Sequence, residues 1–111
     1  MIVSTYQWKG ADVSQPTYAV FVRLRTDLDR SEIERVMRER APEFRALEGL
    51  EQKYYLEGSE PGEYAGFYLW RSLDDVVHYR ESDLAATIAA AYQGIGAPSV
   101  DVFKIVMPLR D

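Results

Sequence analysis

Apolar and polar positions alternate along residues 17–25 with the two-residue period of a β-strand. One side of this segment carries large apolar side chains, and the other carries Ala19, Phe21, Arg23 and Arg25. Similar runs predict three further strands at residues 50–57, 64–70 and 100–109. Because residues 58–62 are rich in turn-forming types, the second and third strands are predicted to form a hairpin.

A helix-start pattern follows the first strand. Asp29 can accept a hydrogen bond from the backbone at the helix start, and Glu32 stands three residues later, as in a capping box. The stripe expected to face the core comprises Ile33, Val36, Met37 and Arg40. Pro42 is expected to end this helix or to begin a short second one that carries Phe44 and Leu47.

The same pattern recurs after the third strand, with Ser72 as the cap and Asp75 at the reciprocal position. Its predicted inward stripe comprises Leu73, Val76, Val77 and Arg80, which places Tyr79 at the flank. A further helical piece is expected to begin near Asp83 and to bury Leu84, Ile88, Ala91 and Tyr92.

The element order is strand, helix, strand, strand, helix, strand, the split pattern of ferredoxin-like α+β domains. We therefore expect a four-stranded antiparallel sheet with the helices on one face. The 111 residues suffice for one hydrophobic core. The domain is expected over residues 17–111, and residues 1–16 are expected to form an N-terminal arm or an extra strand.

Both faces of the predicted sheet are apolar. The third strand places Ala65, Phe67 and Leu69 on one face and Gly66, Tyr68 and Trp70 on the other. Because an open face of this kind exceeds what monomers usually expose, a second copy is predicted to cover it in a homodimer. Arg23, Lys53 and Lys104 are then expected in or at the rim of that interface. The alternative is a monomer whose open face is covered only by residues 1–16.

Charge and composition exclude several functions. The 13 basic and 18 acidic residues are interspersed and give a net charge of −5, which argues against nucleic acid as a partner. The absence of cysteine and the single histidine exclude thiolate catalysis and Cys or His-cluster metal sites. No segment has the length and apolarity of a signal peptide or a membrane helix, so no membrane partner and a cytoplasmic location are expected.

Amphipathic aromatic residues are the remaining candidates for chemistry. They combine an apolar ring with a hydroxyl or indole N–H, which suits a pocket for a planar aromatic ligand but equally an ordinary core or interface. They are Tyr54, Tyr55, Tyr64, Tyr68, Trp70, Tyr79 and Tyr92. The segment Gly94-Ile95-Gly96 lacks the strand and helix of a dinucleotide fingerprint, so neither flavin nor nicotinamide is expected, and no cofactor is predicted.

Two polar residues have alternative interpretations. His78 is the obvious general base near neutral pH, but helical geometry turns it away from the predicted core-facing stripe, which favours a solvated side chain. Arg23, beside Phe21 and Arg25 in mid-strand, could hold a carboxylate or an enolate. Pairing with an acid such as Asp101 is favoured, because buried charges are usually matched.

From Tyr18 onward the chain resembles the dimeric α+β barrel proteins, specifically the YdhR-like group of monooxygenase-like proteins. More distantly, it is similar to the quinone-forming monooxygenases of antibiotic biosynthesis. The matching segments are Ala46-Leu-Glu-Gly-Leu-Glu-Gln-Lys-Tyr-Tyr55, which resembles the family's entry to its second strand, and Ala65-Gly-Phe-Tyr-Leu-Trp70 before the helix that carries Tyr79.

The resemblance implies a pocket in which a deprotonated phenol reacts directly with oxygen. In the quinone-forming relatives, an asparagine on the third strand and a tryptophan four residues later line that pocket. Trp70 matches the tryptophan, whereas Gly66 stands in the place of the asparagine. The haem-degrading branch also requires this asparagine, so its absence counts against that activity.

The resulting hypothesis is a small cofactor-independent monooxygenase-like enzyme of natural-product biosynthesis, acting with O₂ on a phenolic or polyketide-like aromatic. The catalytic residues expected are Trp70, Tyr68, Tyr79 and Tyr54. The substrate-binding residues expected are Arg23, Phe21, Tyr55 and His78. The alternatives are a non-oxidative cyclase or isomerase, and a ligand-binding dimer without turnover.

Overall fold

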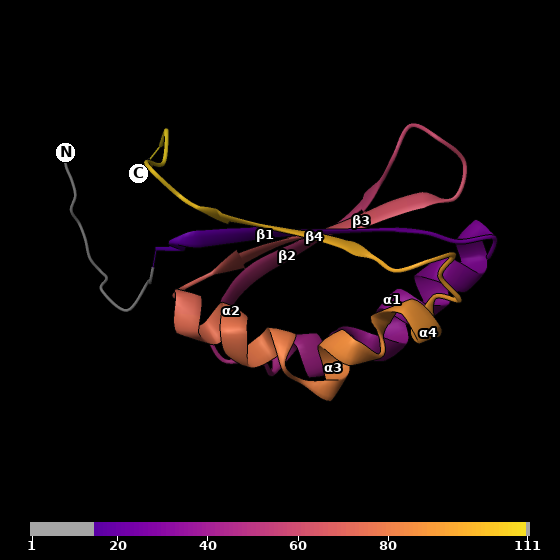
Figure 1. The fold of residues 1–111 in the computed structure, drawn as a ribbon, viewed down its shortest axis with the longest axis horizontal. Coiled ribbons are helices and arrows are strands. Elements are labelled where there is room, and N and C mark those ends of the chain that lie inside the picture. Colours follow the sequence, from indigo (N-terminus) through magenta and orange to yellow (C-terminus); the bar gives the residue numbers. More distant parts are fainter. Residues whose placement is uncertain (1–14, 111) are drawn as a thin grey trace.

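The computed structural model describes residues 15–110, which form a four-stranded antiparallel sheet with strand order β2-β3-β1-β4. The elements are β1 (Tyr18–Arg25), α1 (Arg30–Arg45), β2 (Leu50–Glu57), β3 (Glu63–Trp70), α2 (Leu73–Arg80), α3 (Asp83–Ala86), α4 (Ile88–Ala91) and β4 (Ser99–Lys104). Figure 1 shows the helices as one layer against one face of the sheet. The predicted ferredoxin-like α+β class is thereby confirmed.

Strand register determines which residues face the helices. In β1, Val20 lies opposite Tyr68 of β3 and Val102 of β4, and all three side chains point to the helix layer. The core on this side includes Val20, Val22, Tyr68, Trp70, Ile33, Val36, Phe44, Val76, Tyr79, Ile88 and Tyr92. The even-numbered positions of β1 and β3 therefore form the core face.

Helix α1 begins as the capping pattern predicts, because the Asp29 carboxylate accepts a hydrogen bond from the backbone N–H of Glu32 at 3.0 Å. The helix continues through Pro42 to Arg45, so the predicted break at Pro42 is wrong. Pro42 lies in the last turn, where only one intrahelical bond is lost, and the buried Phe44 ring holds that turn against the core.

Helix α2 is also capped as predicted, with the Ser72 hydroxyl accepting from the backbone N–H of Asp75 at 3.2 Å. The predicted inward stripe is partly wrong, since Leu73 and Val77 are 46% and 44% exposed and the buried pair is Val76 and Tyr79. The eight-residue helix is rotated so that the Tyr79 ring meets the aromatic side chains of β3. After α2, the helical piece near Asp83 is present as α3 and α4, which bury Ile88 and Tyr92 as predicted.

Strand β4 ends at Lys104, earlier than the predicted boundary at Leu109. Lys104 pairs with Tyr18, the first residue of β1, and within residues 15–110 no partner strand extends beyond this pair. Residues 1–14 lie outside the described part of the chain, and the prediction of an N-terminal arm or strand therefore remains a prediction.

The sheet face opposite the helices is covered by no described element. The rings of Phe21 and Phe67 meet edge-to-face there at 5.7 Å, and Tyr54 and Phe103 are more than half exposed. Arg23 also lies on this face, where its guanidinium is 3.3 Å from the Asp101 carboxylate. The favoured pairing of Arg23 with Asp101 is thereby confirmed.

Lys53 and Lys104 were predicted on the open face, and this prediction is wrong. Lys53 lies opposite Tyr68, and Lys104 opposite Tyr18, so both belong to the helix-facing side of the sheet. For Lys53, a β-bulge between Leu50 and Gln52 shifts the alternation of β2, so that Lys53 and Leu50 face the same side of the sheet.

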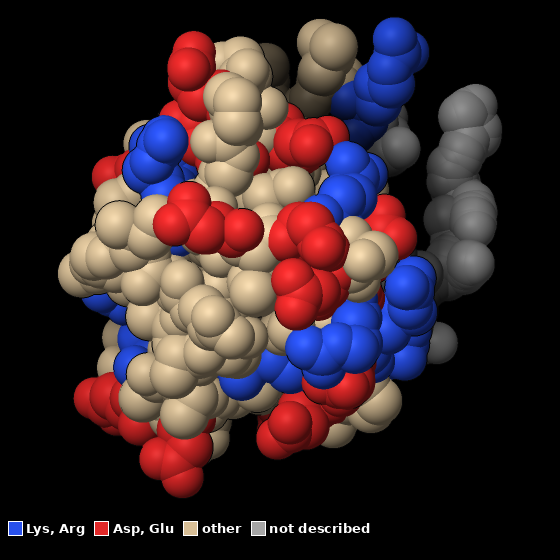
Figure 2. All heavy atoms as spheres, turned by 90° about the vertical axis from the view of Figure 1, so that its right-hand side faces the viewer, with Lys and Arg blue, Asp and Glu red and all other residues tan. Residues whose placement is uncertain are grey.

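Acidic and basic side chains are interspersed on the end of the molecule shown in Figure 2, with uncharged surface between them. This face therefore presents no broad basic surface of the kind that binds phosphate backbones. Within residues 15–110, no helix has both the length and the apolarity needed to cross a membrane.

Candidate functional site

Three of the predicted catalytic residues form one buried aromatic cluster. Tyr68 and Trp70 lie two residues apart on the same face of β3, and their rings stack with centres 6.3 Å apart. The ring centre of Tyr79, from α2, is 5.5 Å from that of Tyr68 and 5.3 Å from that of Trp70. The hydroxyl oxygens of Tyr68 and Tyr79 are 3.3 Å apart, within hydrogen-bonding distance. In the described structure, the buried indole N–H of Trp70 has no hydrogen-bond acceptor. The cluster thus holds polar groups inside an otherwise apolar core.

The tyrosines of this cluster are hydrogen-bond donors and poor bases. Burial raises the pKa of the Tyr68 and Tyr79 hydroxyls, and it raises the pKa of the nearby Tyr92 to about 12. These groups therefore remain protonated at neutral pH and can donate hydrogen bonds.

A cavity of about 360 Å³ lies between β2 and the C-terminal part of α1. Its lining residues are Ala41, Phe44, Arg45, Leu50, Glu51, Gln52, Lys53 and Tyr55. Phe44 joins this cavity to the aromatic cluster, because its ring centre is 6.0 Å from that of Tyr68 and 6.1 Å from that of Tyr79. The volume falls within the usual range for small-molecule sites.

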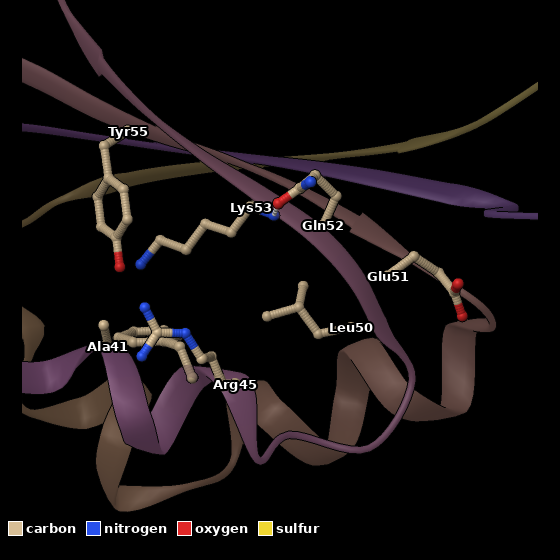
Figure 3. Close-up of a pocket in the computed structure, with 8 residues that line it drawn as sticks. Ala41, Arg45, Leu50, Glu51, Gln52, Lys53 and Tyr55 are labelled. Atoms are coloured by element: carbon tan, nitrogen blue, oxygen red, sulfur yellow. Dashed lines mark hydrogen bonds between the residues drawn. The ribbon is translucent and has the colours of Figure 1, made fainter.

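Lys53 points from β2 into this cavity, toward α1 (Figure 3). Its ammonium nitrogen lies 3.4 Å from the ring centre of Phe44, 4.4 Å from that of Tyr55 and 4.6 Å from that of Tyr68. Three aromatic rings therefore surround a single amine, in an arrangement typical of cation–π contact.

Burial, together with the positive charge of Arg40, lowers the pKa of the Lys53 ammonium to about 7. None of the acids in the described part of the chain forms an ion pair with Lys53. A large fraction of Lys53 is therefore neutral at physiological pH. The side chain can accept a proton from a bound ligand, as a general base does.

Gly66 of β3 provides the space that Lys53 and Tyr68 occupy. A Cβ atom at this position would lie 2.8 Å from Cε1 of Tyr68 and 3.3 Å from Cε of Lys53. The position where the quinone-forming relatives carry asparagine is therefore filled here by neighbouring side chains.

Sequence reasoning missed Lys53 because it assigned the residue to the open face. The available signal was that Tyr55, two residues later, shares its side of β2 and that Gly66 stands opposite Tyr55. A strand position next to such a gap favours a long side chain.

Of the other predicted site residues, only Tyr55 joins this site. Phe21, Arg23 and Tyr54 lie on the open face, separated from the cluster by the sheet, whereas Tyr55 lines the cavity. His78 is exposed on α2, as helical geometry predicts. The eight predicted residues are thus divided between two faces of the sheet and the solvent. Across residues 15–110 no three metal-ligating side chains gather into a metal site.

Another cavity, of about 200 Å³, lies between β1, β4 and the α2–α4 segment. Tyr79 borders it, but most of its lining residues are aliphatic. The cavity of about 360 Å³, by contrast, combines aromatic walls with the amine of Lys53, whose pKa is lowered to about 7.

No protein-family model matches the sequence, and no curated protein matches it significantly. Solved structures do match. A candidate antibiotic biosynthesis monooxygenase from Caulobacter crescentus CB15 aligns with a TM-score of 0.68 at 22% identity, covering 84% of this chain and 92% of that one. SnoaB, a cofactor-independent oxygenase from Streptomyces nogalater, aligns with a TM-score of 0.67 at 18% identity, covering 86% and 99%.

A third match is the NE2512 protein of unknown function from Nitrosomonas europaea, with a TM-score of 0.70 at 16% identity and coverage of 86% and 95%. At such identities the similarity establishes the fold and leaves the activity open. The chain therefore has the ferredoxin-like α+β fold of the antibiotic biosynthesis monooxygenase-like structures, and its resemblance to the dimeric α+β barrel proteins is confirmed at the level of the fold.

Proposed function

We propose that this protein is a small cofactor-independent monooxygenase-like enzyme that oxidises a phenolic aromatic in the cavity between β2 and α1. The observation that carries the proposal is the position of the Lys53 amine, which three aromatic rings surround in this cavity and whose pKa burial lowers to about 7. The fold shared with SnoaB, a cofactor-independent oxygenase, supports the same reaction class.

Oxygenation without a cofactor requires the substrate to supply the electrons, and a phenol does so far better once it is ionised. A free phenol has a pKa of about 10, so a nearby base must take its proton at neutral pH. Neutral Lys53 is placed to accept that proton and then to pair with the resulting phenolate.

The phenolate then transfers electrons to O₂, and oxygen bonds to an activated ring carbon, which carries one hydrogen. Loss of that hydrogen with the second oxygen atom, together with the proton that the phenol gave up, forms water and leaves a quinone carbonyl group, so that one O₂ is consumed per product. The ring of Tyr68 lies 4.6 Å from the amine of Lys53, and its hydroxyl is paired with that of Tyr79, so these protonated hydroxyls can stabilise developing negative charge.

The test is oxygen uptake by protein stripped of metal and flavin, with a panel of hydroxylated anthrones and naphthols and with labelled O₂. We expect uptake to persist, one labelled atom to enter the product, and Lys53→Met to reduce the rate about a hundredfold or more. The exposed Lys104→Met is the control and should retain the rate. Product that forms equally well without oxygen would instead support a cyclase or isomerase, and binding without turnover would support a ligand-binding protein.

We also propose that a second copy of the chain covers the open sheet face. Its apolar residues include Phe21 and Phe67, and the paired charges of Arg23 and Asp101 lie beside them. A self-complementary contact about a two-fold axis buries such a face most simply. In this proposal, Phe21, Arg23 and Tyr54 contribute to the interface.

A further inference from the structure

Two basic side chains meet in the cavity between β2 and α1, although the protein carries a net charge of −5. Arg45 is the last residue of α1, and Lys53 comes from β2. Figure 3 shows the guanidinium of Arg45, the amine of Lys53 and the hydroxyl of Tyr55 pointing toward one another. Three polar head groups from two elements therefore converge at one end of the cavity.

In the described part of the chain, Arg45 and Lys53 lack the acidic partners that three of the other arginines of α1 have, and the fourth, Arg40, donates a hydrogen bond to the Leu84 carbonyl. Arg30 and Arg35 each form an ion pair at 3.0 Å, and Arg38 lies 3.9 Å from a glutamate. Arg45 and Lys53 form none with an acid of residues 15–110. The cavity's own acid, Glu51, points away from both head groups in Figure 3. The converging charges thus have no built-in counter-ion.

The third member of the group is also a donor. Burial raises the pKa of the Tyr55 hydroxyl, which therefore keeps its proton at neutral pH. Arginine and protonated lysine have only donors, so the natural ligand for these three groups is an oxyanion that only accepts hydrogen bonds. The rings of Phe44 and Tyr55 line the same cavity and offer apolar faces to a planar ring.

We propose that Arg45, Lys53 and the Tyr55 hydroxyl form an oxyanion site for the carboxylate of an aromatic acid, whose ring lies in the cavity beside Phe44. This inference rests on the proposed function in that it narrows the substrate class to acidic aromatics. The planar fork of Arg45 matches the two oxygens of a carboxylate, and Lys53 adds a point charge. Arg45 then holds the carboxylate, and with it the ring, while the neutral fraction of Lys53 accepts a proton from a hydroxyl group of the same molecule.

The test is calorimetric binding of 2-naphthoate and of its neutral isostere 2-naphthamide to the full chain, slightly below neutral pH. We expect naphthoate to bind about tenfold or more tightly than the amide. Arg45→Gln and Lys53→Met should each weaken naphthoate binding by about tenfold and leave the amide unchanged. Arg38→Gln, on the exposed face of the same helix, is the matched control and should change neither ligand.

Naphthoate affinity should also fall as pH rises, because Lys53 loses its charge. In the complex, the bound carboxylate stabilises the ammonium form, so the pKa of Lys53 rises above its value of about 7 in the free protein and the affinity falls at a correspondingly higher pH. The other titratable or charged groups around Lys53 and its cavity are Arg40, Arg45, Glu51, Tyr55 and Tyr68. An adjoining cavity of about 30 Å³, which Lys53 and Tyr55 also line, adds Tyr64 and Tyr92. Guanidinium groups are not deprotonated in proteins, so Lys53 dominates the pH response.

Equal affinity for the two ligands, indifference to loss of Arg45 and Lys53, or no binding of naphthoate at millimolar concentration would each overturn the oxyanion site. The two proposals fail separately. If naphthoate binds tightly but no substrate supports oxygen uptake, the oxygenase proposal is wrong and the oxyanion site stands. If Arg45→Gln takes up oxygen at the wild-type rate, and naphthoate and naphthamide bind equally well, the oxyanion site is wrong and the oxygenase proposal stands.

Discussion

The amine of Lys53 lies 3.4 Å from the ring centre of Phe44, so the nearest stabilising group for this charge is an aromatic face. Such contacts contribute about 0.5–2 kcal/mol, which is less than the cost of removing an ammonium group from water. The balance therefore favours the neutral amine, and the lowered pKa of Lys53 follows from it.

This balance can be measured directly, because the chain contains only three lysines, Lys9, Lys53 and Lys104. With lysine labelled by ¹³C at the ε carbon, NMR should resolve one signal that titrates with a midpoint of about 7. Lys53→Met should remove that signal and leave the other two. A Lys53 midpoint that stays near the ordinary value of 10.5 would contradict the buried, uncompensated amine.

Lys53 should also reduce stability. Its pKa falls from 10.5 to about 7 on folding, so the unfolded chain binds more protons between these values and stability rises with pH across that window. The penalty is complete below about 7, where both states are protonated. Lys53→Met should therefore raise the free energy of unfolding by about 2–5 kcal/mol at slightly acidic pH, with the gain shrinking as pH rises.

Urea unfolding at a series of pH values checks this prediction. Lys104→Met serves as the control, because Lys104 is exposed at the sheet edge and should change the free energy of unfolding by less than about 0.5 kcal/mol. If the free energy of unfolding of Lys53→Met exceeds that of the wild type by the same amount at every pH, the stabilisation comes from packing and not from loss of the buried charge.

The strands and helix starts could be predicted from the sequence because their signals are local. Alternation defines β1 within one residue of its observed start, and the caps at Asp29 and Ser72 depend on side chains three residues apart. These patterns require no knowledge of the rest of the fold.

The site could not be predicted in the same way, because it depends on which sheet face the helices cover and on how α2 is rotated. The bulge between Leu50 and Gln52 allows Leu50 and Lys53 to face the same side, which simple alternation forbids. Tyr79 was expected at the flank of α2 and is instead buried, because the aromatic rings of β3 attract that face of the helix. Both outcomes come from tertiary packing.

Gly66→Ala should destabilise the protein, because the added methyl group would clash with its neighbours. The added Cβ would lie 2.8 Å from the ring of Tyr68, a fully buried side chain that has little room to move. We expect a loss of about 1–3 kcal/mol in the free energy of unfolding. Gly94→Ala is the matched control, since its Cβ approaches no atom closer than 3.4 Å and should cost less than about 1 kcal/mol. Equal effects of the two substitutions would contradict the tight fit at Gly66.

The hydroxyl pair of Tyr68 and Tyr79 should show coupling in a double-mutant cycle. Each single change to Phe leaves the other buried hydroxyl without its 3.3 Å partner and should cost about 0.5–1.5 kcal/mol. The double variant should cost less than the sum of the two, because no orphaned hydroxyl remains. Strictly additive losses, measured by urea unfolding, would show that the two hydroxyls do not interact.

The open sheet face predicts the oligomeric state. Phe67 lies in the middle of this face, where its ring meets Phe21 at 5.7 Å, and a lysine there would place a charge inside the proposed interface. Light scattering at micromolar concentration should give the wild-type protein twice the 12.7 kDa mass of one chain, and Phe67→Lys should give the single-chain mass. Val77→Lys, on the exposed side of α2, is the control and should remain dimeric, because Val77 lies on the helix layer, away from the open face. A wild-type mass of one chain would refute the dimer and leave the apolar face of the sheet exposed to solvent.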